Sequence, residues 1–135
     1  MNTGIYAIIQ ARRGSHRFPD KVLADICGKS MFQRVLERVQ RCELLEKVIM
    51  ATTTNPKDKL LLSMARDMGV EVFAGSEENV LDRYYQASQG ANIIVRVTHD
   101  CPLIDPNLMT GVIQYHLLCE NGFTTNRPSY PDGFD

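Results

Sequence analysis

The sequence IYAIIQARRGSHRFPDK, residues 5–21, joins a short apolar run to a basic loop, and this junction indicates the class of fold. Residues 5–9 are apolar and rich in β-branched side chains, with no polar residue among them. A strand that is covered on both faces loses the alternation of polar and apolar residues. Residues 5–9 are therefore predicted to form a central strand of a parallel sheet, and the basic loop follows its carboxyl end.

The rest of the chain alternates between further strands and amphipathic helices. Asp105 precedes a helix that begins at a proline, Ser30 is the expected cap of an earlier helix, and Ser76 is expected to cap a helix that buries Leu81. The remaining expected strands are residues 47–52, 70–74, 92–98 and 123–126, and residues 128–135 are turn-rich. Strands that alternate with helices of this length form βαβ units, so the prediction is an α/β fold with a mostly parallel sheet.

Composition limits the possible functions. The chain has 135 residues and a net charge of −1, which fits one domain and argues against general binding of nucleic acid. No apolar stretch approaches the roughly 20 residues needed to span a bilayer, and the first positive charges follow the apolar run, unlike in a signal peptide. The four cysteines are scattered without metal-site spacing, so we expect reduced thiols and a cytoplasmic protein.

The basic loop carries a local excess of positive charge. Residues 12–21 hold four basic residues against one acidic residue, a net +3, whereas the other 125 residues carry 11 basic and 15 acidic residues, a net −4. The guanidinium groups of Arg12 and Arg17 can each bind two phosphate oxygens at once, and Lys21 adds a mobile positive charge. Gly14 and Ser15 allow backbone amides to turn toward an anion. The loop matches neither GxxxxGK[ST] nor GxGxxG. It is either a phosphate site or a solvated basic loop.

A second polar cluster, residues 98–102, follows the expected strand 92–98 and contains Asp100. Ligands of open α/β sheets bind beyond the carboxyl ends of the strands, which is where both clusters lie. Mg²⁺ needs only one or two protein carboxylates when phosphates and water complete its shell, so Asp100 is a candidate ligand. The alternative is that Asp100 only bonds the backbone of its own turn before Pro102.

Six motifs together resemble the sugar-activating cytidylyltransferases, and most closely the CMP-KDO synthetase-like proteins, which include the spore coat polysaccharide biosynthesis protein F family. The motifs are QARRGSHRFPDK (10–21), LADICGK (23–29), ATTTNP (51–56), GSEENVLDRYY (75–85), VRVTHDCPLID (95–105) and YPDG (130–133). The resemblance implies a Rossmann-like αβα sandwich of the nucleotide-diphospho-sugar transferase, or glycosyltransferase-A, type. It further implies that CTP activates a sugar or sugar acid for surface polysaccharide synthesis, with Mg²⁺ as cofactor and release of pyrophosphate.

The resemblance also implies roles for individual residues. Those implied to bind the nucleotide are Ala11, Arg12, Gly14, Ser15, Arg17, Lys21, Arg83 and Arg96. Arg12 and Lys21 would stabilise the transition state, and Asp100 would hold the metal. A salt bridge would explain Arg83 or Arg96 equally well.

The chain departs from the family pattern in four residues and in length. Arg13 and His16 stand where neutral residues are usual. Asp20 replaces a glycine, which adds negative charge beside Lys21 and restricts the backbone, and His99 replaces a small residue; Asp20 and His99 are each expected to weaken phosphate binding. The family is nearly twice as long, so residues 1–135 correspond to a single nucleotide-binding domain, truncated to roughly the N-terminal half. A homodimer is possible. The alternatives are a non-catalytic nucleotide-binding module and a glycosyltransferase that uses a nucleotide sugar.

Overall fold

The computed structural model describes residues 3–14 and 17–126, which contain a four-stranded parallel sheet with the strand order β5-β4-β1-β6. The strands of this sheet are β1 (Ile5–Gln10), β4 (Lys47–Thr53), β5 (Glu71–Gly75) and β6 (Ile93–Thr98). The helices are α1 (Met31–Val39), α2 (Lys59–Asp67), α3 (Val80–Ala87) and α4 (Pro106–Cys119), with 3-10 turns η1 (Lys21–Leu23) and η2 (Pro56–Asp58). The expected α/β class and parallel sheet are confirmed.

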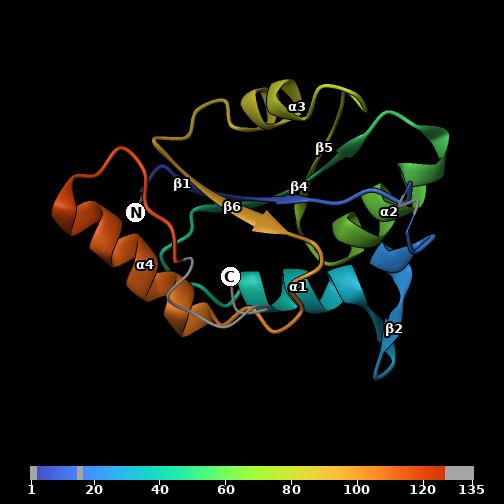
Figure 1. Ribbon diagram of the computed structural model, residues 1–135, viewed down its shortest axis with the longest axis horizontal. Coiled ribbons are helices and arrows are strands. Elements are labelled where there is room, and N and C mark those ends of the chain that lie inside the picture. Colours follow the sequence, from blue (N-terminus) through green and yellow to red (C-terminus); the bar gives the residue numbers. More distant parts are fainter. Residues whose placement is uncertain (1–2, 15–16, 127–135) are drawn as a thin grey trace.

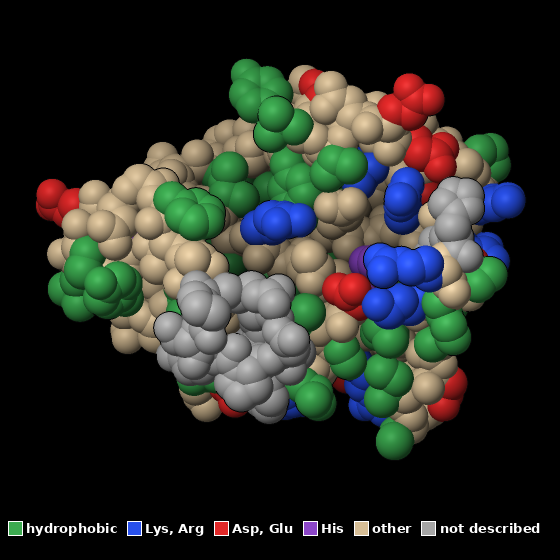
Figure 2. Space-filling view, in the orientation of Figure 1, with side chains coloured by type: hydrophobic (Ala, Val, Ile, Leu, Met, Phe, Trp, Pro, Cys, Tyr) green, Lys and Arg blue, Asp and Glu red, His purple; other side chains and the backbone are tan. Residues whose placement is uncertain are grey.

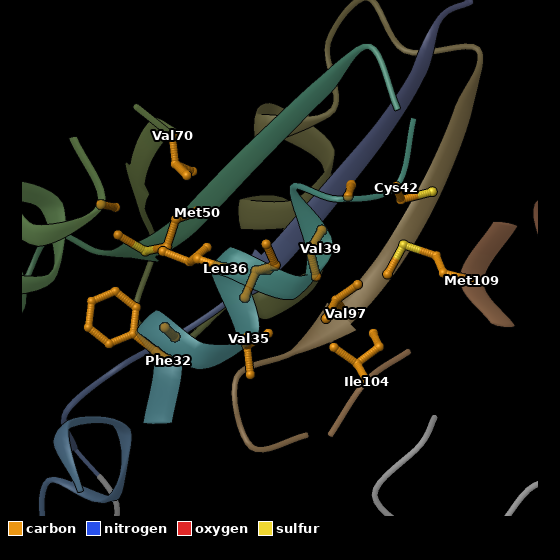
Figure 3. Close-up of a cluster of buried hydrophobic side chains, with 14 of the residues drawn as sticks. Phe32, Val35, Leu36, Val39, Cys42, Met50, Val70, Val97, Ile104 and Met109 are labelled. Carbon is orange, nitrogen blue, oxygen red and sulfur yellow. The ribbon is translucent and has the colours of Figure 1, made fainter. Parts of the chain in front are cut away.

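Helices cover both faces of the sheet, which gives three layers (Figure 1). Alternate residues of β1 enter two separate cores: Ile9 packs with α1, α2 and α4, whereas Ile8 packs on the side of α3. Figure 3 shows the first core, in which Phe32 and Leu36 of α1 lie near Met50 of β4. Burial of both faces explains why residues 5–9 of β1 are all apolar, and the αβα sandwich is confirmed.

Helix α1 begins at a complete capping box. The Ser30 side chain accepts a hydrogen bond from the backbone N–H of Gln33, and the Gln33 side chain accepts one from the backbone N–H of Ser30. These bonds satisfy donors that a helix start leaves free, so Ser30 is the cap that the sequence predicted. Within the described ranges, no helix is long and apolar enough to cross a bilayer.

Four local expectations need correction or lie outside the described residues. Helix α3 begins after Asn79, whose side chain accepts from Asp82 N–H, and not at Ser76; Leu81 then faces solvent with 80% of its surface exposed. Residues 123–126 form no strand, and the expected turns of residues 128–135 are outside the described part of the chain. The strands β2 (Asp25–Ile26) and β3 (Lys29–Ser30), of two residues each, form a hairpin. The hairpin was not predicted, because strands this short show no periodicity.

Candidate functional site

The basic loop and the cluster after β6 meet at one edge of the sheet. Gln10, at the end of β1, is paired with Thr98, at the end of β6, so the residues that follow both strands emerge side by side. Lys21 Nζ lies 3.0 Å from Asp100 Oδ2, although the two residues are 79 positions apart. Figure 2 shows several Lys and Arg side chains gathered on this part of the surface, next to acidic and histidine side chains. The tertiary structure therefore brings the two polar clusters into direct contact.

Asp100 is held in its charged form by its surroundings. Partial burial acts to raise its pKa, but hydrogen bonds from Lys21 and Thr98, with the positive charge of Lys21, outweigh burial and leave the pKa below its usual value. Burial lowers the pKa of His99, whose Nδ1 lies 3.1 Å from the carbonyl oxygen of Gln10. At neutral pH the site thus contains an ionised carboxylate beside a neutral imidazole.

A buried carboxylate, Asp58, fastens the start of the basic loop to the sheet. The backbone N–H of Arg13 donates to Asp58 Oδ1 at 2.9 Å, and the hydroxyl of Thr53, the last residue of β4, donates to Asp58 Oδ2. Asp58 was not predicted from the sequence, because an aspartate in a first helical turn is usually exposed and is stabilised there by the helix dipole. The available signal was its position just beyond the carboxyl end of β4, at the same edge as the loop.

Two of the residues that depart from the family pattern, Arg13 and Asp20, are paired with each other. Arg13 Nε and Nη2 donate to the two carboxylate oxygens of Asp20, each at 2.9 Å. The hydrogen bond from Arg13 lowers the pKa of Asp20, with a further contribution from the positive charge of Lys57. The negative charge that was expected beside Lys21 therefore lies against Arg13. The expected restriction of the backbone is real, since Asp20 adopts the left-handed conformation with φ of 54°.

The other predicted loop residues differ in their exposure. Arg12, Gly14 and Arg17 are exposed, whereas Ala11 is buried and its N–H donates to Ala51 O at 3.1 Å, within the sheet. Ser15 and His16 lie outside the described residues. A hollow of about 390 Å³ lies beside the loop and is lined by Arg17, Phe18, Lys21, Ala24 and Met31. The exposed cations and this hollow form a surface that is open to an anion.

Arg83 and Arg96, for which a salt bridge was the alternative explanation, lie on the side of the sheet covered by α3. Arg83 is fully buried and donates from Nη1 to Ser76 O at 2.8 Å, while its Nε and Nη2 have no hydrogen-bond partner among the described residues. Burial lowers the pKa of Arg83, and the positive charge of Arg12 lowers it further. Arg96 is exposed, with Cζ 5.9 Å from the ring centroid of Tyr84. Neither arginine is in a salt bridge within the described part of the chain.

A larger hollow, of about 530 Å³, runs along β6 and α4. Its lining includes Arg96 and Thr98 but none of the described loop residues, 11–14 and 17–21. Volume alone would place a ligand there, yet the charged side chains that converge lie at the loop. We therefore take the loop, Asp58 and Asp100 as the candidate site.

Comparisons with known proteins agree with this fold. The sequence model of the family described as "Cytidylyltransferase" matches residues 6–127. The spore coat polysaccharide biosynthesis protein SpsF of Bacillus subtilis is 36% identical over 83% of this chain and 49% of its own length. A solved cytidylyltransferase from Leptospira borgpetersenii is 30% identical, with a TM-score of 0.88 over 98% of this chain and 58% of that one.

A third relative was solved with a nucleotide bound. This CMP:2-keto-3-deoxy-manno-octonic acid synthetase, complexed with CTP, is 25% identical, with a TM-score of 0.71 over 84% of this chain and 47% of that one. The chain spans about half the length of the curated relatives that it matches. The match of the family model extends over nearly the whole sequence and is supported by the sequence and structural relatives. The chain therefore belongs to the cytidylyltransferase family.

Proposed function

We propose that residues 1–135 form a single nucleotide-binding domain that holds CTP and Mg²⁺ at the basic loop and Asp100. Within a cytidylyltransferase, this domain serves the transfer of CMP to a sugar or sugar acid, with release of pyrophosphate, for surface polysaccharide synthesis in the cytoplasm. The observation that carries the proposal is the 3.0 Å contact between Lys21 Nζ and Asp100 Oδ2. A cation suited to phosphate and a carboxylate suited to Mg²⁺ are therefore close enough to serve one ligand.

The arrangement supports binding and catalysis through positive charge, and the proposed reaction needs no activated nucleophilic side chain. Arg12 and Arg17 are exposed and positioned on the loop to contact phosphate oxygens, and Lys21 exchanges Asp100 for a phosphate oxygen when the nucleotide arrives. The attacking sugar oxygen forms a bond to the α-phosphorus, the bond from that phosphorus to the pyrophosphate oxygen breaks, and the hydroxyl proton leaves to solvent. Arg12 and Lys21 stabilise the negative charge that shifts onto the phosphate oxygens during this exchange.

The donor set fits Mg²⁺ shared with phosphates better than a metal site built from protein alone. Asp100 is ionised and accessible, and the described residues contain no group of three or more His, Cys, Asp or Glu side chains placed to hold a metal. Mg²⁺ commonly takes one or two carboxylates together with substrate phosphates and water. Asp100 would hold the ion, which neutralises phosphate charge when bound.

Further support comes from what the relatives are named for. The synthetase at 25% identity was solved with CTP, and SpsF is named for spore coat polysaccharide biosynthesis. A contact from Arg83 to the nucleotide requires its cover to open, because its guanidinium is fully buried; two of its nitrogens have no hydrogen-bond partner among the described residues. A homodimer completes the proposal; exposed Tyr115 and Leu118 on α4 are available to a second copy.

The test is to titrate the chain with each of the four nucleoside triphosphates, with and without Mg²⁺, and to follow thermal unfolding. A true ligand at a hundredfold excess over its Kd stabilises the folded state by about 2.7 kcal/mol, so CTP with Mg²⁺ should raise the Tm most. Release of pyrophosphate from CTP with a 2-keto sugar acid then supports transfer. Binding without turnover supports the non-catalytic module, and consumption of a nucleotide sugar without pyrophosphate supports a glycosyltransferase. A Tm that no triphosphate changes would refute the nucleotide site.

A further inference from the structure

We propose that Arg13 and Asp20 are positioning residues, whose ion pair ties together the two ends of the basic loop and fixes the points from which Arg12 and Lys21 extend toward the triphosphate. This inference rests on the proposed function. It assigns to the pair a structural task that neither residue has alone, because neither side chain needs to touch the nucleotide.

The geometry at Arg13 leaves little freedom. Its guanidinium makes two parallel bonds to Asp20, each of 2.9 Å, and its Nη1 also donates to the carbonyl oxygen of Lys57 at 3.3 Å. Its backbone N–H is bound to Asp58, which is buried and bonded in turn to Thr53 of β4. Arg13 is thus connected to the sheet through its backbone and to the far end of the loop through its side chain.

The geometry at Asp20 connects the pair to the candidate catalytic lysine. Asp20 is in the left-handed conformation, and its carbonyl oxygen accepts the N–H of Leu23 at 2.8 Å, at the start of η1. Lys21 follows directly and reaches Asp100. A left-handed aspartate is less favourable than a glycine, so this backbone persists because surrounding bonds, including those from Arg13, hold it. Fixing Asp20 therefore fixes the point from which the Lys21 side chain extends.

If the charge of Asp20 is removed, a purely electrostatic role and a positioning role predict opposite changes in nucleotide affinity. This difference makes the inference testable. The pair has no net charge, so it adds little attraction for a phosphate as a whole. If Asp20 acted only through its charge, removing that charge would strengthen the binding of an anionic nucleotide. If Asp20 acts by closing the loop, the same change weakens binding, because a ligand site that must be ordered on binding loses affinity.

The experiment measures the Kd of CTP with Mg²⁺ for a matched set of variants. Asp20→Asn keeps a side chain that tolerates the left-handed backbone but removes the charge, and Arg13→Met keeps an unbranched chain of similar reach. We expect each change to raise the Kd by about three- to tenfold. The Kd of the double variant should be no higher than that of the single variant that binds less tightly. Arg13→Lys should recover part of the lost affinity, because lysine keeps the positive charge but cannot make the two parallel hydrogen bonds to Asp20. Glu71→Gln, which breaks the ion pair with Lys47 elsewhere on the sheet, is the control and should leave the Kd unchanged.

A second readout needs no nucleotide. Trypsin cleavage after Arg17, followed by mass spectrometry, reports opening of the loop, and Arg13→Met and Asp20→Asn should both accelerate it relative to the unchanged chain and to Glu71→Gln. Tighter CTP binding by Asp20→Asn, additive losses in the double variant, or unchanged cleavage would each overturn the inference. If the unchanged chain binds no triphosphate while both variants still open the loop, the proposed function fails and the loop-closing pair stands.

Discussion

Replacing Lys21 by methionine should separate the stability of the fold from the binding of the nucleotide. Methionine keeps most of the unbranched alkyl chain and removes the charge, so Asp100 loses its partner while packing is little changed. The expected result is a small loss of unfolding free energy together with a large loss of affinity for CTP with Mg²⁺. Urea unfolding measures the first quantity, and isothermal titration measures the second.

The two magnitudes come from the geometry of the pair. At 3.0 Å and an effective dielectric constant of about 20, the attraction of Lys21 to Asp100 is about 5.5 kcal/mol before desolvation. The two side chains are 37% and 39% exposed, so solvent screening reduces the net contribution to folding to about 0–1 kcal/mol. A charge-assisted bond to phosphate contributes about 1–3 kcal/mol to binding, which corresponds to a rise in Kd of about 5- to 150-fold.

Lys47→Met is the matched control. Lys47 Nζ lies 3.2 Å from Glu71, with the side chains 38% and 58% exposed, but this pair is at the amino ends of β4 and β5, the edge opposite the loop. Lys47 also lies over the Tyr6 ring at 5.3 Å, so this variant should lose at least as much stability as Lys21→Met while keeping its affinity for CTP. The reasoning is refuted if Lys21→Met binds CTP within a factor of two of the unchanged chain, or if both variants lose affinity equally.

Three more perturbations have defined outcomes. Asp100→Asn should abolish the gain in CTP affinity on adding Mg²⁺ and leave the urea midpoint nearly unchanged, as titrations with and without Mg²⁺ can show; a retained Mg²⁺ response would exclude Asp100 as the ligand. The pKa of Asp20 is lowered by Arg13, so its contribution to stability is present above its unfolded value of about 4 and is lost as the pH falls through the folded value. Urea midpoints measured from pH 7 to pH 2 should therefore fall less steeply for Asp20→Asn, and parallel curves would contradict this linkage. Ser30→Ala removes the capping box of α1 and should lower the unfolding free energy by about 1 kcal/mol without changing the Kd for CTP; an unchanged urea midpoint would show that the cap adds nothing.

Local pattern was sufficient to predict some elements and insufficient for others. Residues 5–9 of β1 are apolar on both faces, and only a buried strand or a buried helix segment tolerates that pattern, so the short length of the run settled the choice. Ser76 and Asn79 are both good helix caps, and the sequence gives no reason to choose between them; packing selected Asn79 and turned Leu81 to solvent. Burial of the charged Arg83 was also beyond prediction, since arginine is rarely buried.

The amino-acid sequence by itself determined the order of strands and helices, and with it the edge at which the basic loop and Asp100 emerge. The physical reason is that parallel strands joined by right-handed crossovers place all their carboxyl ends together. Only the tertiary structure decided which charges are partners: Arg13 with Asp20, and Lys21 with Asp100. The net charge of a segment can be counted along the chain, but an ion pair depends on distances of a few ångströms between side chains, and the packing of the helices and turns on the sheet sets those distances.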